Sequence, residues 1–346
     1  MMNSKIKRLL RKNIFELSPY SSAREEYVGK EGIFLDANEN PYGIYNRYPD
    51  PYQNQLKQKL AEIKKCKSNQ IFIGNGSDEV IDLAFRIFCE PYQDTALTFA
   101  PTYGMYQVSA DINAVELIQI PLNKNFQIDR KTVENCLKDE NLKLIFICSP
   151  NNPTGNLLNT DDIEFILQKF SGIVIIDEAY IDFAAQNSFI EKLNIYPNLI
   201  VSQTLSKAWG LAGIRLGVAY MNEEILAFYN KVKSPYNISS INQEMTLKYL
   251  NQQEEFNSKL NEILFERTKL INELNHLNLV KKVYPTDANF ILMEVKNADE
   301  LYKKLIEKQI IIRNRNSVIP KCLRITVGTP EENQKLITEL KVIDNG

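Results

Sequence analysis

The stretch Ile173-Val174-Ile175-Ile176-Asp177 sets four β-branched residues directly before a carboxylate, and Tyr180 follows three residues later. An earlier run, Leu144-Ile145-Phe146-Ile147, has the same unbroken apolar character. Runs in which apolar and polar residues do not alternate are typical of strands that are covered on both faces. They predict an α/β fold, in which a mainly parallel sheet carries helices on both sides.

The segments around these two strands continue the same pattern. Strand-like and helix-like stretches alternate from about residue 51, with further strands expected at 71–73, 96–99, 115–120, 199–203 and 215–220. The last two are separated by too few residues for the crossover of about a dozen that joins parallel neighbours. We therefore expect one antiparallel strand in the sheet.

The chain of 346 residues is longer than a single hydrophobic core usually serves. Residues 1–46 are interpreted as an N-terminal helix and an irregular arm, of the kind that often contacts a partner. Residues 47–243 are expected to form the large α/β domain. A long helix at 244–275 begins the remainder, 244–346, which we expect to be a smaller α+β domain.

The composition excludes several classes of protein. Lys and Arg number 41 against 43 Asp and Glu, for a net charge of −2, which argues against a surface for nucleic acid or for an anionic membrane. No apolar run is long enough to span a bilayer, and the basic residues near the N-terminus precede no signal-like apolar segment. These features predict a soluble, cytoplasmic protein.

Metal and disulfide chemistry find little support in the sequence. The five cysteines are widely spaced without a C-x-x-C pair, and His276 is the single histidine. These counts disfavour a disulfide framework, a zinc site and a Ser-His-Asp triad. We expect no metal site, and we interpret His276 as an ordinary surface residue.

Several polar residues follow strands in Gly-, Asn- or Ser-rich turns, where open α/β sheets bind ligands. They are Asn152, Asp177, Tyr180, Thr204, Ser206, Lys207 and Arg215. Each type has an ordinary explanation by itself: a lysine is usually a surface charge, an Asn-rich stretch is often only a turn, an aspartate can cap a helix, and an arginine can form an ion pair. Their order and spacing together favour a single site.

Two more turns could contribute to that site. The glycine-rich turn Gly74-Asn75-Gly76-Ser77-Asp78 joins a predicted strand to a predicted helix, so that amide groups at the helix start could face an anion. Tyr103 follows another strand, either as a ring that stacks on a ligand or as a core tyrosine. Taken alone, both features are also common in purely structural settings.

This ordered set resembles the fold-type I family of pyridoxal-phosphate enzymes over nearly the whole chain. The resemblance implies pyridoxal 5'-phosphate as the cofactor and a seven-stranded sheet in the large domain. It makes Lys207 the residue that joins the cofactor covalently and Asp177 the partner of the ring nitrogen. A carboxylate at that place keeps the ring nitrogen protonated, so that the ring can withdraw electrons from a carbanion. The lysine must lose its proton more easily than it does in water.

The remaining cofactor contacts follow from the same resemblance. Tyr180 and Asn152 are expected at the ring oxygen, and Tyr103 is expected to stack on the ring. The residues expected to hold the cofactor phosphate are Gly76, Ser77, Asp78, Thr204, Ser206 and Arg215.

Five shorter stretches are similar to the histidinol-phosphate aminotransferase family. They lie at 17–24, 35–41, 46–49, 177–183 and 323–329. The similarity implies transamination between L-glutamate or 2-oxoglutarate and imidazole-acetol phosphate or L-histidinol phosphate, a step of histidine biosynthesis, by a homodimer. It implies that Tyr48 reaches the neighbouring subunit's cofactor phosphate. The substrate contacts that it implies are Tyr20, Asn38, Asn152, Arg313 and Arg324.

A pair of arginines suits that reaction, because a planar guanidinium can bind either a carboxylate or a phosphate monoester through two hydrogen bonds. Two segments on the substrate side are shorter than the family generally has. One lies between Pro41 and Asn46, and the other lies between Arg313 and Cys322.

Other functions remain compatible with the same residues. A decarboxylase acting on threonine phosphate and an aminotransferase acting on aromatic amino acids would use the same cofactor chemistry. A non-enzymatic regulator that binds the cofactor is disfavoured, because the chain begins almost directly with the enzyme-like arm and its charge is nearly balanced.

Overall fold

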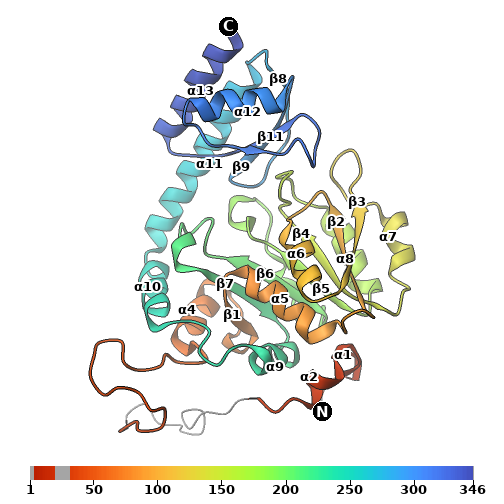
Figure 1. The fold of residues 1–346 in the computed structure, drawn as a ribbon, viewed down its shortest axis with the longest axis vertical. Helices are drawn as coiled ribbons and strands as arrows, with labels where there is room; N and C mark the ends of the chain where they lie inside the picture. Colours follow the sequence, from red (N-terminus) through yellow and green to blue (C-terminus); the bar gives the residue numbers. More distant parts are fainter. Residues whose placement is uncertain (1–3, 20–31, 346) are drawn as a thin grey trace.

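The computed structural model describes residues 4–19 and 32–345, which form two β-sheets and the helices that cover them (Figure 1). The first sheet has seven strands in the order β1-β7-β6-β5-β4-β2-β3. These strands are β1 (Ile71–Asn75), β2 (Thr95–Ala100), β3 (Glu116–Pro121), β4 (Leu142–Cys148), β5 (Ile173–Asp177), β6 (Leu199–Thr204) and β7 (Leu216–Met221).

The pairing of these strands confirms the expected mainly parallel sheet. The strands from β2 to β6 pair in parallel with their neighbours. Strand β7 is antiparallel to both β6 and β1. It is therefore the single antiparallel strand that the short connection after β6 requires.

Helices cover both faces of the first sheet. One face packs against α4 (Asn54–Lys64), α7 (Arg130–Cys136), α8 (Thr160–Lys169) and α10 (Ser240–Leu250). The other packs against α5 (Ser77–Phe88), α6 (Met105–Ile112), α9 (Glu223–Val232) and the short α1 (Ser4–Leu9) and α2 (Lys12–Glu16).

The unbroken apolar run of β5 reflects its position inside this three-layer arrangement. All five of its residues are buried. Val174 and Ile176 pack in the cluster on one face, and Ile173 and Ile175 pack in the cluster on the other. Because successive side chains of a strand point to opposite faces, both sets must be apolar when both faces are covered. Asp177, the last residue of the strand, is the exception.

Gly217 lets β7 pass directly against the start of α5. A Cβ atom added to Gly217 would lie 2.2 Å from the backbone nitrogen of Ser77, the first residue of that helix. Only a residue without a side chain permits so close an approach. The contact fixes the N-terminus of α5 at the end of the sheet where β5 and β6 also end.

The second sheet has four strands in the order β10-β11-β9-β8, and its pairs are antiparallel. They are β8 (Val280–Val283), β9 (Phe290–Val295), β10 (Arg313–Asn314) and β11 (Cys322–Thr326). Its core is shared with α11 (Gln253–Asn275), α12 (Ala298–Glu307) and α13 (Pro330–Asn345).

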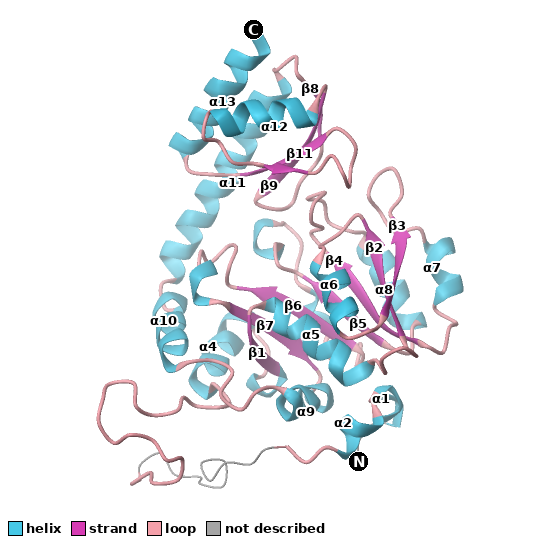
Figure 2. Ribbon diagram, in the orientation of Figure 1, coloured by secondary structure: helices cyan, strands magenta, loops and turns pink. Residues whose placement is uncertain are grey.

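The long helix expected at 244–275 is divided in the structure. It consists of α10, which packs on the first sheet, and α11, which packs on the second, with a break at Asn251 and Gln252. Figure 2 shows α11 running from the side of the first sheet to the second. The break lets each helix follow its own sheet.

The described residues contain no helix that is long and apolar enough to cross a membrane. They also contain no group of three or more His, Cys, Asp or Glu side chains placed to hold a metal ion.

Candidate active site

A cavity of about 380 Å³ opens at the carboxyl ends of the central strands, beneath the second sheet. That volume lies within the range of roughly 300–1,000 Å³ found for small-molecule sites. The predicted site residues that line it are Gly76, Ser77, Asp78, Tyr103, Asn152, Asp177, Tyr180, Thr204, Ser206, Lys207, Arg215, Arg313 and Arg324. The structure thus brings together residues that lie up to 248 positions apart in the chain (324 − 76).

Asp177 places a buried carboxyl group at the floor of this cavity. Its side chain accepts hydrogen bonds from the Tyr106 hydroxyl (2.7 Å) and from the Ala179 amide (3.1 Å). Burial raises the pKa of the carboxyl group, and these two hydrogen bonds oppose the rise. Among the described residues Asp177 forms no salt bridge, and the charge of Lys207 is the cationic influence on its pKa. An N–H cation of a ligand would suit this carboxylate.

Lys207 faces the same cavity from the loop that follows β6. Its amine is open to the cavity, yet the surrounding protein desolvates it and lowers its pKa. The positive charges of Arg324 and Arg215 lower that pKa further, while Asp177 raises it. A lysine that loses its proton more easily has a larger fraction of the neutral amine, the form that attacks a carbonyl group.

The loop that carries Lys207 is fixed by aromatic packing two residues further on. The ring of Trp209 stacks on Phe256 of α11, with centroids 4.0 Å apart. Lys207 Nζ lies 5.8 Å from the centroid of the Tyr180 ring. The stacking of Trp209 on α11 therefore fixes the loop that places the Lys207 amine beside Tyr180.

Tyr180, Asn152 and Arg324 form a chain of polar contacts across the cavity. The Asn152 amide donates to the Tyr180 hydroxyl (3.5 Å), and Arg324 Nη1 donates to Asn152 Oδ1. Burial raises the pKa of Tyr180, and Arg324 opposes the rise. Because Arg324 comes from β11, this chain joins the second sheet to the turn that follows β4.

The N-terminus of α5 and Arg215 form a cradle for an anion. The helix begins after Gly76, whose φ is +79°, and no side chain caps its first amide groups. A Cβ atom on Gly76 would lie 2.9 Å from Arg215 Nη2, so glycine keeps this space open. Free amide groups at a helix start, with a guanidinium beside them, suit a phosphate group.

Glu178, next to Asp177, does not line the cavity and instead anchors the loop after β5. It accepts hydrogen bonds from the Phe189 amide (2.7 Å) and from Gln203 Nε2 (2.9 Å). Burial raises its pKa to about 6. This anchoring holds Tyr180 in the wall of the cavity.

The cavity residues together fit pyridoxal phosphate. The cradle at α5 suits its phosphate, Asp177 suits a protonated ring nitrogen, and Lys207 suits its aldehyde. The fit rests on the open space at Gly76, on the carboxylate without a cationic partner among the described residues, and on the lowered pKa of the amine.

Two of the predicted residues, Asn38 and Tyr48, do not line this cavity in the single chain. Tyr20 lies outside the described residues. Asn38 and Tyr48 line a separate cavity of about 350 Å³ between the end of the arm, the residues that follow it and residues 239–241. There the Tyr48 ring stacks on Tyr236 with centroids 4.4 Å apart. Figure 1 shows the described residues 32–48 on the side of the first sheet that lies away from the second sheet.

The sequence interpretation missed four residues that line the main cavity: Cys148, Ala179, Ala212 and Arg315. Cys148 pairs with Asp177 in the ladder between β4 and β5, which only the strand register reveals. Arg315 lies two residues after Arg313, and the period of two along a strand would have placed both on one face. Tyr106 was also missed; its hydroxyl reaches Asp177 across 71 positions of sequence.

Comparisons with known proteins agree with this geometry. The family described as aminotransferase class I and II matches residues 34–340. A histidinol-phosphate aminotransferase of Parabacteroides distasonis is 50% identical over 339 residues, which cover 97% of this chain and 98% of the relative.

Two solved structures share the fold. The histidinol-phosphate aminotransferase of Clostridium acetobutylicum has a TM-score of 0.80 at 27% identity, covering 89% of this chain and 98% of that one. The histidinol-phosphate aminotransferase of Sinorhizobium meliloti, solved in complex with pyridoxal-5'-phosphate, has a TM-score of 0.78 at 21% identity and covers 89% of this chain and 90% of that one.

The raised pKa of Asp177 predicts a pH-dependent gain in stability for Asp177→Asn. The folded protein binds the proton of Asp177 more tightly than the unfolded chain, whose carboxyl has its ordinary pKa of 3.8. Stability of the parent protein therefore falls as the pH rises through 3.8 toward the folded pKa. Asparagine avoids this loss and keeps an acceptor oxygen for Tyr106 and Ala179.

We expect ligand-free Asp177→Asn to have a larger free energy of unfolding than the parent at about pH 8, with the difference shrinking toward about pH 4. Urea titrations at a series of pH values measure this, and the exposed Asp111→Asn provides the control. An Asp177→Asn protein that is less stable than the parent at every pH would contradict the assignment of a buried, charged Asp177.

Proposed function

We propose that this chain, which belongs to the class I and II aminotransferase family, is a histidinol-phosphate aminotransferase. The reaction is the transfer of an amino group between L-glutamate and imidazole-acetol phosphate, a step of histidine biosynthesis. The observation that carries the proposal is one cavity in which Lys207 and Asp177 lie beneath the paired arginines Arg313 and Arg324. The full-length similarity to histidinol-phosphate aminotransferases supports it.

Pyridoxal phosphate is the cofactor. When bound, it supplies an electron-withdrawing ring and an aldehyde that can take up an amino group. Asp177 would hold the proton on the ring nitrogen, because a buried carboxylate favours a protonated partner. Asn152 and Tyr180 would bind the ring oxygen. The N-terminus of α5, Ser206, Thr204 and Arg215 would hold the phosphate, while Tyr103 would cover one ring face.

Lys207 has two tasks in this account. Its amine, with its lowered pKa, would bond the cofactor covalently between turnovers. Once a substrate amine has replaced it, Lys207 Nζ would take the proton from the substrate Cα and return it on the cofactor side. Both tasks need a neutral amine near the substrate, and burial beside Arg324 and Arg215 favours that form.

Arg313 and Arg324 would bind the acidic end of each substrate. They stand directly opposite each other in the ladder between β10 and β11. The carboxylate of glutamate and the phosphate of the second substrate must occupy this place in turn, and a guanidinium can bind either through two hydrogen bonds. Like charges opposite each other destabilise a strand pair, so an anion between them relieves the repulsion.

The dimer and the arm are part of the proposal. We propose that Tyr48 contacts the cofactor phosphate of the partner subunit, and that Tyr20 and Asn38 complete the substrate site. The arm, residues 1–46, would then serve the partner, 47–243 would form the cofactor domain, and 244–346 would form the smaller domain. A cytoplasmic location suits the five free cysteines.

A substrate panel tests the proposed reaction. With 2-oxoglutarate as acceptor, we expect histidinol phosphate to give glutamate with a kcat/KM at least about tenfold above that of phenylalanine, tyrosine or threonine phosphate. The reason is that the arginines favour an anionic group away from the reacting amine. Release of carbon dioxide from threonine phosphate, or a preference for an aromatic amino acid, would contradict the proposal.

Mixing two variants tests the shared site. Lys207→Ala should abolish turnover, and Tyr48→Ala should weaken cofactor binding, so each is impaired alone. Hybrid dimers formed from both carry one site with Lys207 from one subunit and Tyr48 from the other. After subunit exchange we expect activity from about a quarter of the sites, because half of the dimers are hybrids with one native site each.

The control for that mixture is Lys207→Ala with the double variant Lys207→Ala/Tyr48→Ala, which contains no site with a native lysine. Recovery in the first mixture and none in the control is the expected pair of results. If the first mixture recovers nothing although native electrophoresis or mass measurement shows hybrids, Tyr48 does not serve the partner's site.

A further inference from the structure

Arg315 lies on the same strand face as Arg313 and Arg324. The Arg315 amide donates to the Cys322 carbonyl (3.0 Å), which continues the pairing of β10 with β11 by one residue. Because alternate residues of a strand share a face, Arg313 and Arg315 point the same way. All three arginines line the main cavity.

The Arg315 side chain has its charge directed into the cavity without an acidic partner. Its Nε atom, like that of Arg324, is buried and has no hydrogen-bond partner among the described residues. Burial lowers the pKa of Arg315, and the charges of Arg324 and Arg313 lower it further. A buried, unpartnered donor among like charges destabilises the protein, and an anion in the cavity would remove that cost.

The backbone around Arg315 is braced from outside the cavity. The side-chain amides of Asn314 and Asn316 both donate through Nδ2 to the Asp299 carboxylate, at 2.7 Å and 2.8 Å. The Lys321 amide in turn donates to Asn316 Oδ1 (2.7 Å). The Asp299 carboxylate therefore binds the two residues that flank Arg315. These contacts fix the chain on either side of Arg315 in the absence of a ligand.

The two substrates differ in what a third arginine could add. A carboxylate has two oxygens and one negative charge, which one or two guanidinium groups satisfy. A phosphate monoester has three terminal oxygens and carries close to two negative charges at neutral pH. Two arginines leave part of the charge of a phosphate monoester unpaired. A third arginine can pair with the rest only if it lines the same cavity, as Arg315 does.

We infer that Arg315 is the residue by which this site distinguishes a phosphate monoester from a carboxylate: it binds the substrate phosphate and contributes little to the binding of glutamate. This inference rests on the proposed function, because it assumes that a phosphorylated amine and glutamate use the same cavity. It adds to the Arg313 and Arg324 pair a residue whose contribution differs between the two half-reactions.

Two half-reactions of the holoenzyme test this inference. Single-turnover reactions with histidinol phosphate and with glutamate are followed separately through the cofactor absorbance. In Arg315→Gln we expect the apparent Kd for histidinol phosphate to rise about tenfold to a hundredfold, as for the loss of a hydrogen bond to a charged group, and the value for glutamate to change less than about threefold. Arg315→Lys should recover part of the loss, because it restores the charge without the planar fork.

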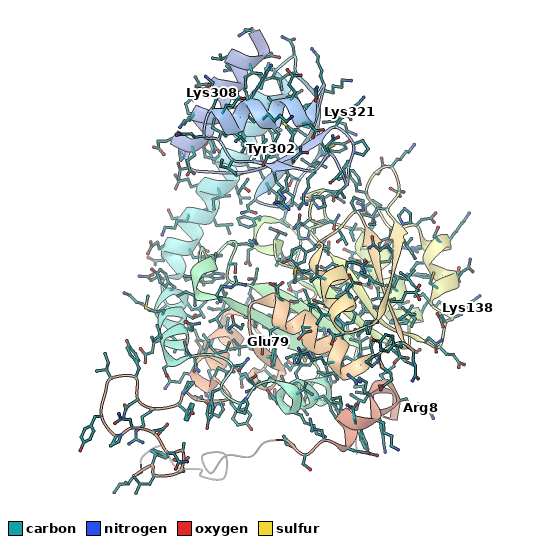
Figure 3. The ribbon with its side chains drawn as sticks, viewed as in Figure 1. Arg8, Glu79, Lys138, Tyr302, Lys308 and Lys321 are labelled. Carbon is teal, nitrogen blue, oxygen red and sulfur yellow. The ribbon has the colours of Figure 1, made fainter. Side chains whose placement is uncertain are left out.

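Lys321→Gln is the matched control. It removes a positive charge from the same loop, but Lys321 is exposed and does not line the cavity, and Figure 3 labels it at the outer edge of the second sheet. We expect both half-reactions of this variant to match the parent. If Lys321→Gln lost as much affinity for histidinol phosphate as Arg315→Gln does, the effect of Arg315 would be one of general surface charge. That result would overturn the inference.

The outcomes separate the inference from the proposed function. A parent enzyme that reacts with glutamate but with no phosphorylated amine would refute the proposed function. A parent that uses histidinol phosphate, with an Arg315→Gln variant that loses affinity equally for both donors or for neither, would overturn the role of Arg315 alone. A selective loss for the phosphorylated donor supports it.

Discussion

A carboxylate buried at the end of β5 is the constraint on which the rest of the site depends. Asp177 is 3% exposed and holds only two hydrogen bonds, from Tyr106 and Ala179, among the described residues. A charge in such a place is costly unless a cation approaches it. Strand β5, which carries Asp177, is apolar on both faces because helices cover both. Asp177 and Lys207 line the same cavity at the end of that strand.

Both sheets contribute residues to the site. The residues expected to bind the cofactor come from the first sheet and its turns, while the three arginines come from the second. Contacts between the sheets hold the two sets in register: the Asp287 amide donates to the Gly155 carbonyl (2.7 Å), and the Leu157 amide donates to the Asp287 carboxylate (2.9 Å). Arg324 adds its bond to Asn152. The substrate side is thus positioned by the turn that follows β4.

The sequence sufficed for those features that depend on local pattern. Unbroken apolar runs identified β4 and β5, and the short gap after β6 required the antiparallel β7. The cavity residues of the first sheet could be selected because they end or follow strands, whereas Arg313 and Arg324, which lie within β10 and β11, were implied only by the family resemblance. Features that depend on distant contacts were not accessible: the break between α10 and α11 arises because two helices follow two different sheets, and Tyr106 acquires its role through Asp177, which no spacing reveals. Asn38 and Tyr48 line a separate cavity in the single chain, away from Lys207, and only the folded arrangement of the chain reveals this.

In the proposed function, pyridoxal phosphate lies between the amine of Lys207 and the carboxylate of Asp177. Reduction of the purified holoenzyme with borohydride, followed by peptide mapping with mass spectrometry, tests it most directly, because reduction makes the link between a lysine and the cofactor permanent. We expect a phosphopyridoxyl group on the peptide that contains Lys207 and on no other peptide, and we expect the Asp177→Ala protein to carry less of it. An adduct on a different lysine, or a folded holoenzyme whose Lys207 peptide stays unmodified, would show that Lys207 does not bind the cofactor.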